Sequence, residues 1–128
     1  MQQRAGLLFL SKKTERILLI LEDQHWTVPT FSRKSSLLSD AEPLLESYSQ
    51  GKIVPIELYL SEDRGFEYGT YVCIVNEEFL TCASETIAWS KLTHLPRQLH
   101  NGLKATLNNQ SIKTKIETIL ELENANIV

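Results

Sequence analysis

The sequence predicts a single domain, residues 1–128, of the α/β (α+β) class, in which strands and helices share one core. Three observations lead to this class. Apolar runs typical of β-strands recur up to residue 89, one capped helix interrupts them near residue 40, and two amphipathic stripes follow residue 95. With 128 residues, 42% of them hydrophobic, the chain is long enough for one core and too short for two ordinary domains.

A β-hairpin is predicted at the start of the chain. Apolar runs at residues 5–10 and 17–21 are separated by a polar stretch, which is typical of two well-buried strands joined by a turn. Residues 25–29 predict a short extended segment. Pro29 closes this segment, because proline cannot donate a ladder hydrogen bond.

A helix is predicted to start at residue 39. Ser39 and Glu42 have the spacing of a capping box, in which the two residues satisfy each other's backbone donors. Leucines and a tyrosine give the following turns an apolar side, and Gly51 is a suitable C-terminal stop.

Further strands are predicted in the middle of the chain, because β-branched and aromatic residues are frequent there. They cover residues 53–60, 66–75, 79–83 and 85–89, with a turn at 61–65. Cys73 and Cys82 would face each other across a turn at residues 77–78. They do not form a zinc-ligand set, and we expect two reduced, half-buried thiols.

Two helices are predicted after residue 95. Pro96 suits the first position of a helix, and leucines at 99, 103 and 107 form one apolar stripe behind it. A second amphipathic helix, about residues 111–123, is expected to be capped by Ser111. Residues 124–128 are expected to fray.

The charge distribution is uneven. Residues 1–35 carry six basic and three acidic groups, residues 36–85 two basic and ten acidic groups, and residues 86–128 five basic and three acidic groups. The net charge of −3 disfavours a generally basic nucleic-acid binder. Apolar runs are far too short to span a membrane, and the first residues lack a secretory h-region. We therefore expect a cytoplasmic protein with no membrane partner.

The order of these motifs resembles the Nudix superfamily, especially its small MutT-like members of phage type. The matching residues near the N-terminus are Ala5-Gly6 with the apolar run that follows, the run at residues 17–20, and Trp26-x-x-Pro29. Near the C-terminus they are Glu85-x-x-x-Trp89 and Leu95-Pro96-x-x-Leu99-His100-x-Gly102. The resemblance covers roughly residues 4–108 and implies an α/β/α sandwich around a mixed β-sheet. If the chain comes from a phage, it implies the host cytoplasm as location.

The catalytic signature of this family, G-x5-E-x7-R-E-U-x-E-E-x-G-U with U a bulky aliphatic residue, is degenerate here. In the family its glutamates gather Mg²⁺ ions that neutralise a diphosphate and help generate the attacking hydroxide. This sequence has Thr30-Phe31 where the family has Gly-Gly. Counted without gaps from Phe31, Glu46 is the one agreement, and the paired metal-binding glutamates fall on Ser49 and Gln50. Alignment of Gly51 with the last glycine of the signature gives no carboxylate pair at these positions either.

Three carboxylates are candidates for a substitute metal site. Glu42 and Glu46 are four residues apart and share a helix face, and Glu85 matches a position that can serve as ligand or base in the family. Glu46 and Glu85 are then the candidate catalytic residues. The alternative is that the three are a cap residue, a solvated helix surface and a strand-edge carboxylate. No cofactor is expected unless the site forms, in which case it takes Mg²⁺.

Four residues are candidates for ligand binding. Arg33 and Lys34 follow Phe31 in the loop that replaces the family's Gly-Gly. A basic pair beside an aromatic ring suits a phosphate and a base, and it equally suits an exposed loop. Tyr68 is a further ring that can stack on a base.

Three functional hypotheses follow. The first is a catalytically degenerate Nudix-fold protein that acts as a binding module for a nucleotide, RNA or protein. The second is a divergent Mg²⁺-dependent hydrolase of nucleoside diphosphate derivatives that uses Glu42, Glu46 and Glu85. The third is a structural or oligomerisation protein, such as a homodimer, that uses the C-terminal helix at residues 111–123.

Overall fold

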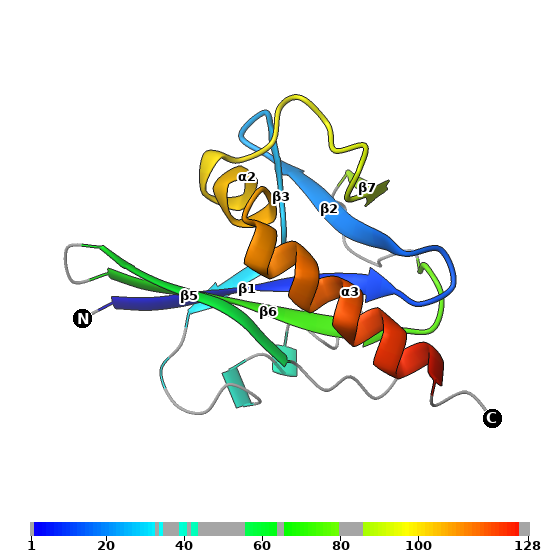
Figure 1. Cartoon of the computed structure of the whole chain (residues 1–128). Coiled ribbons are helices and arrows are strands. Elements are labelled where there is room, and N and C mark those ends of the chain that lie inside the picture. Colours follow the sequence, from blue (N-terminus) through cyan, green and yellow to red (C-terminus); the bar gives the residue numbers. More distant parts are fainter. Residues whose placement is uncertain are drawn as a thin grey trace.

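A mixed β-sheet carries two helices on one face in the computed structural model of this chain (Figure 1). The structure describes residues 2–32, 34, 39–40, 42–43, 56–63, 66–79 and 86–125. The predicted α+β class is confirmed. The second helical layer of the predicted sandwich falls mostly outside these residues. Residues 39–40 and 42–43 are helical, as the capping box predicts, whereas residues 44–51 lie outside the described ranges.

The described strands follow one another along most of the chain. They are β1 (Gln2–Ser11), β2 (Arg16–Glu22), β3 (His25–Thr27), β4 (Thr30–Ser32), β5 (Ile56–Asp63), β6 (Phe66–Val75) and β7 (Ile87–Lys91). The described helices are α2 (Asn101–Leu107) and α3 (Gln110–Ala125). None of the helices in the described ranges has both the length and the apolar character needed to cross a membrane.

Strand β1 is the centre of the sheet. It runs parallel to β6 along its whole length and antiparallel to β2 and β4 at its two ends. Leu7, Leu8, Phe9 and Leu10 are all fully buried, as expected for a strand that is covered on both faces. The predicted hairpin is therefore correct, with Leu10 opposite Ile17.

Beyond that turn β2 diverges from β1. It pairs with β7 on one edge and with β3 on the other. A two-residue turn joins β2 to β3, and both of its residues, Asp23 and Gln24, have positive φ. Residues 28–29 then return the chain to β1, where the N–H of Leu7 donates to the carbonyl of Pro29 at 2.9 Å. This return places β4 beside the N-terminal half of β1.

Two buried clusters lie on the two faces of the sheet. The face under α2 and α3 holds Leu8, Leu10, Leu19 and Val72 together with the apolar stripe of both helices, namely Leu103, Leu107, Ile112, Ile116 and Leu120. The opposite face holds Ala5, Leu7, Phe9, Leu18, Phe31, Tyr71 and Cys73. Trp26 is partly buried and packs against the first cluster, and Trp89 is partly buried and packs against the second.

Several predicted element ends are wrong. Strand β5 continues through residues 61–63, predicted as a turn, because they pair with β6. Strand β7 is Ile87–Lys91 rather than residues 85–89. Phe79 is not in a strand, and residues 80–83 lie outside the described ranges. Cys73 is free, as expected, but fully rather than half-buried, whereas Cys82 lies outside those ranges.

The helix ends also differ from the prediction. Helix α2 starts at Asn101 rather than at Pro96, because the segment before it pairs with β3: the N–H of Trp26 donates to the carbonyl of Gln98, and the N–H of His100 donates to the carbonyl of Trp26. Helix α3 is capped by Asn109 rather than by Ser111. The Oδ1 atom of Asn109 accepts from the N–H of Ser111 at 2.9 Å and of Ile112 at 3.4 Å. Residues 124–125, predicted to fray, are still helical.

Candidate functional site

A polar group lies at the N-terminal end of the central strand. Arg4 of β1 is exposed, and its guanidinium donates to Oγ1 of Thr30 at 3.0 Å and to Oγ of Ser32 at 3.5 Å. Both hydroxyls are on β4, and the register pairs Arg4 directly with Ser32. The neighbouring strand therefore fixes the direction of the guanidinium.

Arg4 has no acidic partner among the side chains that the structure describes. Within the described ranges Arg4 forms no ion pair, and only hydroxyl groups bond to its guanidinium. Two hydroxyl contacts leave further N–H groups of its five donors available. An oriented, unpaired guanidinium at a sheet surface is suited to a carboxylate or a phosphate.

Two of the predicted ligand-binding residues adjoin this group. Tyr68 of β6 is the register partner of Arg4 on the side away from β4. Lys34 follows two residues after Ser32 and is exposed. Its N–H donates to Oδ2 of Asp40 at 2.8 Å, which ties the segment after β4 to the helical residues 39–40. Arg33, the other predicted basic residue, lies outside the described ranges.

Phe31 occupies the opposite face of the sheet. It pairs with Ala5, and strand alternation separates it from the side chains of Thr30 and Ser32. Its side chain is 9% exposed and packs in the cluster that contains Leu7 and Tyr71. The predicted stacking of its ring on a base stays a prediction.

Solved structures of similar fold are Nudix hydrolases. One is a Caenorhabditis elegans Ap4A hydrolase binary complex, 12% identical, with a TM-score of 0.65 over 92% of this chain and 99% of that chain. Another is the Nudix hydrolase RenU from M. smegmatis, 17% identical, with a TM-score of 0.66 over 91% and 87%. The chain has the Nudix fold. A putative Nudix hydrolase from Chromobacterium violaceum, 14% identical, is similar over 98% of this chain and 92% of its own, with a TM-score of 0.66.

Sequence comparison gives no further guide to the relatives of this Nudix-fold chain. No family model matches it, and no curated protein matches it. The fold predicted from the order of short motifs is confirmed. Similarity at 12 to 17% identity shows the fold alone, so the chemistry has to be inferred from the residues of this chain.

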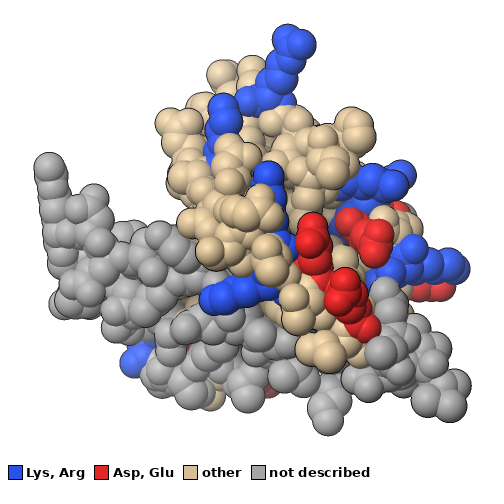
Figure 2. Space-filling model, viewed as in Figure 1, with Lys and Arg blue, Asp and Glu red and all other residues tan. Residues whose placement is uncertain are grey.

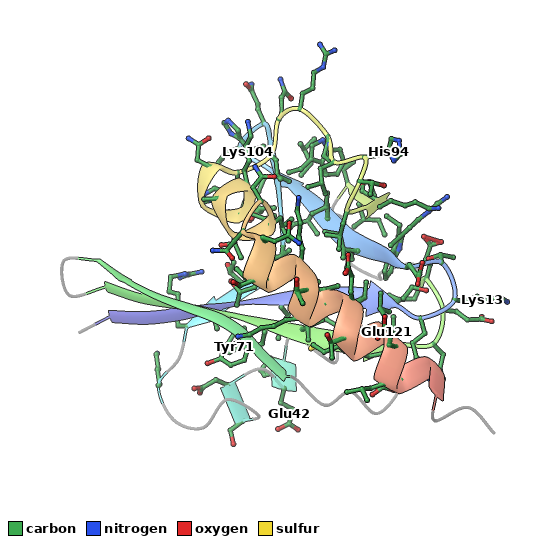
Figure 3. All side chains as sticks on the ribbon, in the orientation of Figure 1. Lys13, Glu42, Tyr71, His94, Lys104 and Glu121 are labelled. Carbon is green, nitrogen blue, oxygen red and sulfur yellow. The ribbon has the colours of Figure 1, made fainter. Side chains whose placement is uncertain are left out.

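Carboxylates for a magnesium site are sparse in the described part of this Nudix fold. Glu42 is exposed and lies below the sheet, with its carboxylate directed away from it (Figure 3). Glu46 and Glu85 lie outside the described ranges. The described residues contain no group of three or more His, Cys, Asp or Glu side chains that could hold a metal ion. The ligand set of Glu42, Glu46 and Glu85 stays a prediction.

Sequence reasoning did not single out Arg4, Thr30 or Ser32. The register of β1 and β4 brings them together across 26 and 28 positions of sequence. Thr30 did attract notice as a replacement for a family glycine, but no periodic pattern links it to Arg4. A charged residue directly before the apolar run at residues 5–10 is the one signal that the sequence offers.

Proposed function

We propose that this chain binds a nucleotide at the N-terminal end of its central sheet and does not hydrolyse it. One observation carries the proposal: the guanidinium of Arg4 is oriented by Thr30 and Ser32 and has no carboxylate partner in the described ranges. A charged group held ready in this way binds an anion at a lower entropic cost than a freely rotating side chain.

The chemistry around Arg4 favours a phosphate attached to an aromatic base. The planar fork of a guanidinium matches two oxygens of a phosphate, and Lys34 adds an exposed cation on the adjoining segment. Tyr68, next to Arg4 on β6, is our candidate for stacking on the base. Arg33 belongs to the same proposed phosphate-binding loop.

The absence of hydrolysis is proposed from the residues at the positions of the Nudix box. A diphosphate hydrolase needs carboxylates to bring Mg²⁺ to the phosphates, because hydroxyl and amide groups supply no charge to offset the dehydration of the ion. The matched positions hold Ser49 and Gln50. Glu42 and Glu46 alone are a weak ligand set for Mg²⁺. We therefore propose that the chain binds the nucleotide but has lost its hydrolysis.

A thermal-shift panel tests the binding. Nucleoside mono-, di- and triphosphates, ADP-ribose and a dinucleoside polyphosphate are each added with and without Mg²⁺, because a ligand that binds the folded state raises the melting temperature. Arg4→Gln is expected to abolish the shift. Lys13→Gln is the matched control, since Lys13 lies in the turn after the other end of β1 and forms an ion pair with the exposed Glu77. Shifts that are equal in both variants would contradict the proposed site.

A hydrolysis assay tests the second part. The same compounds are incubated with protein and Mg²⁺, and the products are separated by chromatography. We expect no turnover. Turnover that depends on Mg²⁺ and is lost in Glu46→Gln would establish the hydrolase alternative, in which Glu42, Glu46 and Glu85 form the metal site.

The structure does not favour oligomerisation through the apolar stripe of α3. Ile112, Ile116 and Leu120 are 2%, 0% and 8% exposed, because they face the sheet of their own chain. On the outer side of the helix, Leu122 is 61% exposed, and Leu21 on β2 is the other exposed large apolar residue of the described part. A protein partner or homodimer therefore stays an outcome to be tested on other surfaces.

A further inference from the structure

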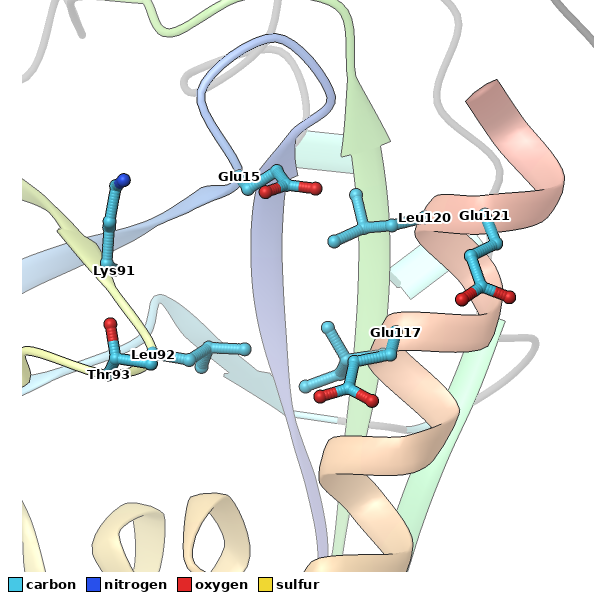
Figure 4. A pocket seen from close by; sticks show the side chains of 8 residues that line it. Glu15, Lys91, Leu92, Thr93, Glu117, Leu120 and Glu121 are labelled. Carbon is cyan, nitrogen blue, oxygen red and sulfur yellow. The ribbon is translucent and has the colours of Figure 1, made fainter. Parts of the chain in front are cut away.

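A groove separates helix α3 from the β1–β2 turn and from the end of β7, far from the Arg4 group. Its volume is about 390 Å³, within the range of small-ligand cavities. Its floor is apolar and consists of Leu92, Ile116 and Leu120. Figure 4 shows that Leu92, near the end of β7, and Leu120, on α3, point toward one another. The proposed nucleotide site does not use this groove.

The rim of the groove is acidic. Glu15 comes from the β1–β2 turn, and Glu117 and Glu121 come from successive turns of α3. All three side chains belong to exposed residues, and none of them forms an ion pair within the described ranges. Acidic side chains gather on this face of the molecule over α3 (Figure 2). Lys91 lies on the far wall, across the groove from α3 (Figure 4).

The carboxylates stand on separate walls rather than around one point. The described residues contain no group of three carboxylate, imidazole or thiol side chains that could hold a metal ion. Glu15, Glu117 and Glu121 therefore cannot together coordinate one small divalent cation. They can bind several positive charges that are joined by apolar spacers, and the spacers would cover the leucines of the floor.

We propose that this groove binds a linear aliphatic polyamine. Its methylene chain lies on Leu92, Ile116 and Leu120, and its ammonium groups meet Glu117 and Glu121 on one wall and Glu15 on the other. Charge and shape are then both complementary, since burial of the methylenes removes apolar area from water while the charged ends remain solvated at the rim. Lys91 excludes a fourth cation from the remaining wall.

Calorimetric titration of the full chain with spermidine tests the proposal. Butylamine supplies one ammonium on a similar stem, and MgCl₂ at equal ionic strength controls for screening of the acidic surface. We expect saturable binding of spermidine, at least about tenfold weaker binding of butylamine, and no binding of Mg²⁺ at this groove. Saturation by Mg²⁺ that displaces spermidine would overturn the proposal.

Matched variants locate the site. Glu117→Gln with Glu121→Gln is expected to weaken spermidine binding about tenfold or more, since each substitution keeps the shape of the side chain and removes its charge. Glu22→Gln is the control, because Glu22 is an exposed carboxylate on β2 outside the groove. Equal weakening in the control would show general charge attraction and overturn the site. A tetralysine peptide that binds the groove while spermidine does not would overturn the choice of occupant. Nucleotide binding is measured separately with Arg4→Gln, so the two proposals fail independently.

Discussion

The guanidinium of Arg4, on β1, donates a hydrogen bond to the hydroxyl of Thr30, on β4, over 3.0 Å. Thr30 therefore acts as a positioning residue for the charge that the proposed nucleotide site uses. It orients a side chain that would otherwise sample many rotamers, and it does so without neutralising the positive charge.

Replacement of Thr30 by valine separates orientation from charge. Valine has nearly the same shape and suits a strand, so we expect the free energy of unfolding to change by less than about 1 kcal/mol. Nucleotide binding should weaken by about three- to tenfold, because a hydrogen bond to a charged group contributes roughly 1.5–3 kcal/mol and Ser32 retains part of the orientation. Calorimetric titration measures the affinity.

Thr114→Val on α3 is the control for that substitution. Thr114 is exposed, and its hydroxyl donates to the carbonyl of Gln110 on its own helix. The affinity of the Thr114→Val protein for the nucleotide should equal that of the unaltered chain. A Thr30→Val protein with unchanged affinity would show that the hydroxyl does not orient Arg4 in the complex.

The start of α3 allows a second test, since sequence and structure assign different caps to it. The side chain of Asn109 accepts from two N–H groups of the first turn, whereas Ser111 lies inside the helix. Asn109→Ala should lower the free energy of unfolding by about 1 kcal/mol, because two backbone donors lose their acceptor. Ser111→Ala should change it by only a few tenths, and alanine is the better helix former. Urea denaturation followed by circular dichroism distinguishes the two, and the reverse ranking would restore Ser111 as the cap.

The elements that the sequence predicted well are those whose pattern has a single cause. Strands β1 and β2 are apolar on both faces because their side chains are buried on both faces of the sheet. The apolar stripe of α3 repeats because one side of the helix is buried. Burial alone creates these periods. Their positions along the chain were therefore correct to within a few residues.

Element ends and the Arg4 group depend on contacts that no local pattern records. Leu99 belongs to the predicted helical stripe and is indeed buried, yet its neighbours Gln98 and His100 bond to the backbone of Trp26 and delay the start of α2. Likewise Arg4 meets Thr30 only because the chain returns to β1 after Pro29. Such tertiary pairing overrides local preference.

Two glycines provide a third test because an added methyl group meets different surroundings at each. At Gly69, on β6, a Cβ atom would lie 2.9 Å from Cε2 of Tyr71, a ring that is 3% exposed. Gly69→Ala should therefore cost about 1–3 kcal/mol in the free energy of unfolding, since the ring is packed in the core and cannot move freely.

At Gly102 the same change should be neutral or stabilising. The nearest atom is Cε1 of His100 at 3.2 Å, the end of an exposed side chain, and Gly102 is inside α2. Alanine is favoured over glycine in a helix by up to about 1 kcal/mol. Chemical denaturation of both variants measures the difference. Equal stability of Gly69→Ala and Gly102→Ala would show that Tyr71 has room to shift.

The thiol of Cys73 gives the fourth test, through its dependence on pH. Cys73 is fully buried on β6, and burial raises the pKa of its thiol from 9.0 to about 12. Below pH 9 both the folded and the unfolded chain hold this proton, so its contribution to stability is fully present. Between about pH 9 and pH 12 the unfolded chain loses the proton first, so the folded state becomes less stable as the pH rises.

Comparison with Cys73→Ser isolates this effect, because a serine hydroxyl does not titrate in the range. The free energy of unfolding is measured by urea denaturation from pH 7 to pH 11 for both proteins in a Cys82→Ala background. The unaltered Cys73 protein should lose more stability above pH 9 than the serine variant. In the same background an aromatic disulfide reagent should not modify native Cys73 at pH 8 and should modify it fully in urea, since the thiolate is the reactive form. Parallel stability curves together with rapid native modification would mean that the thiol is accessible and ionises normally.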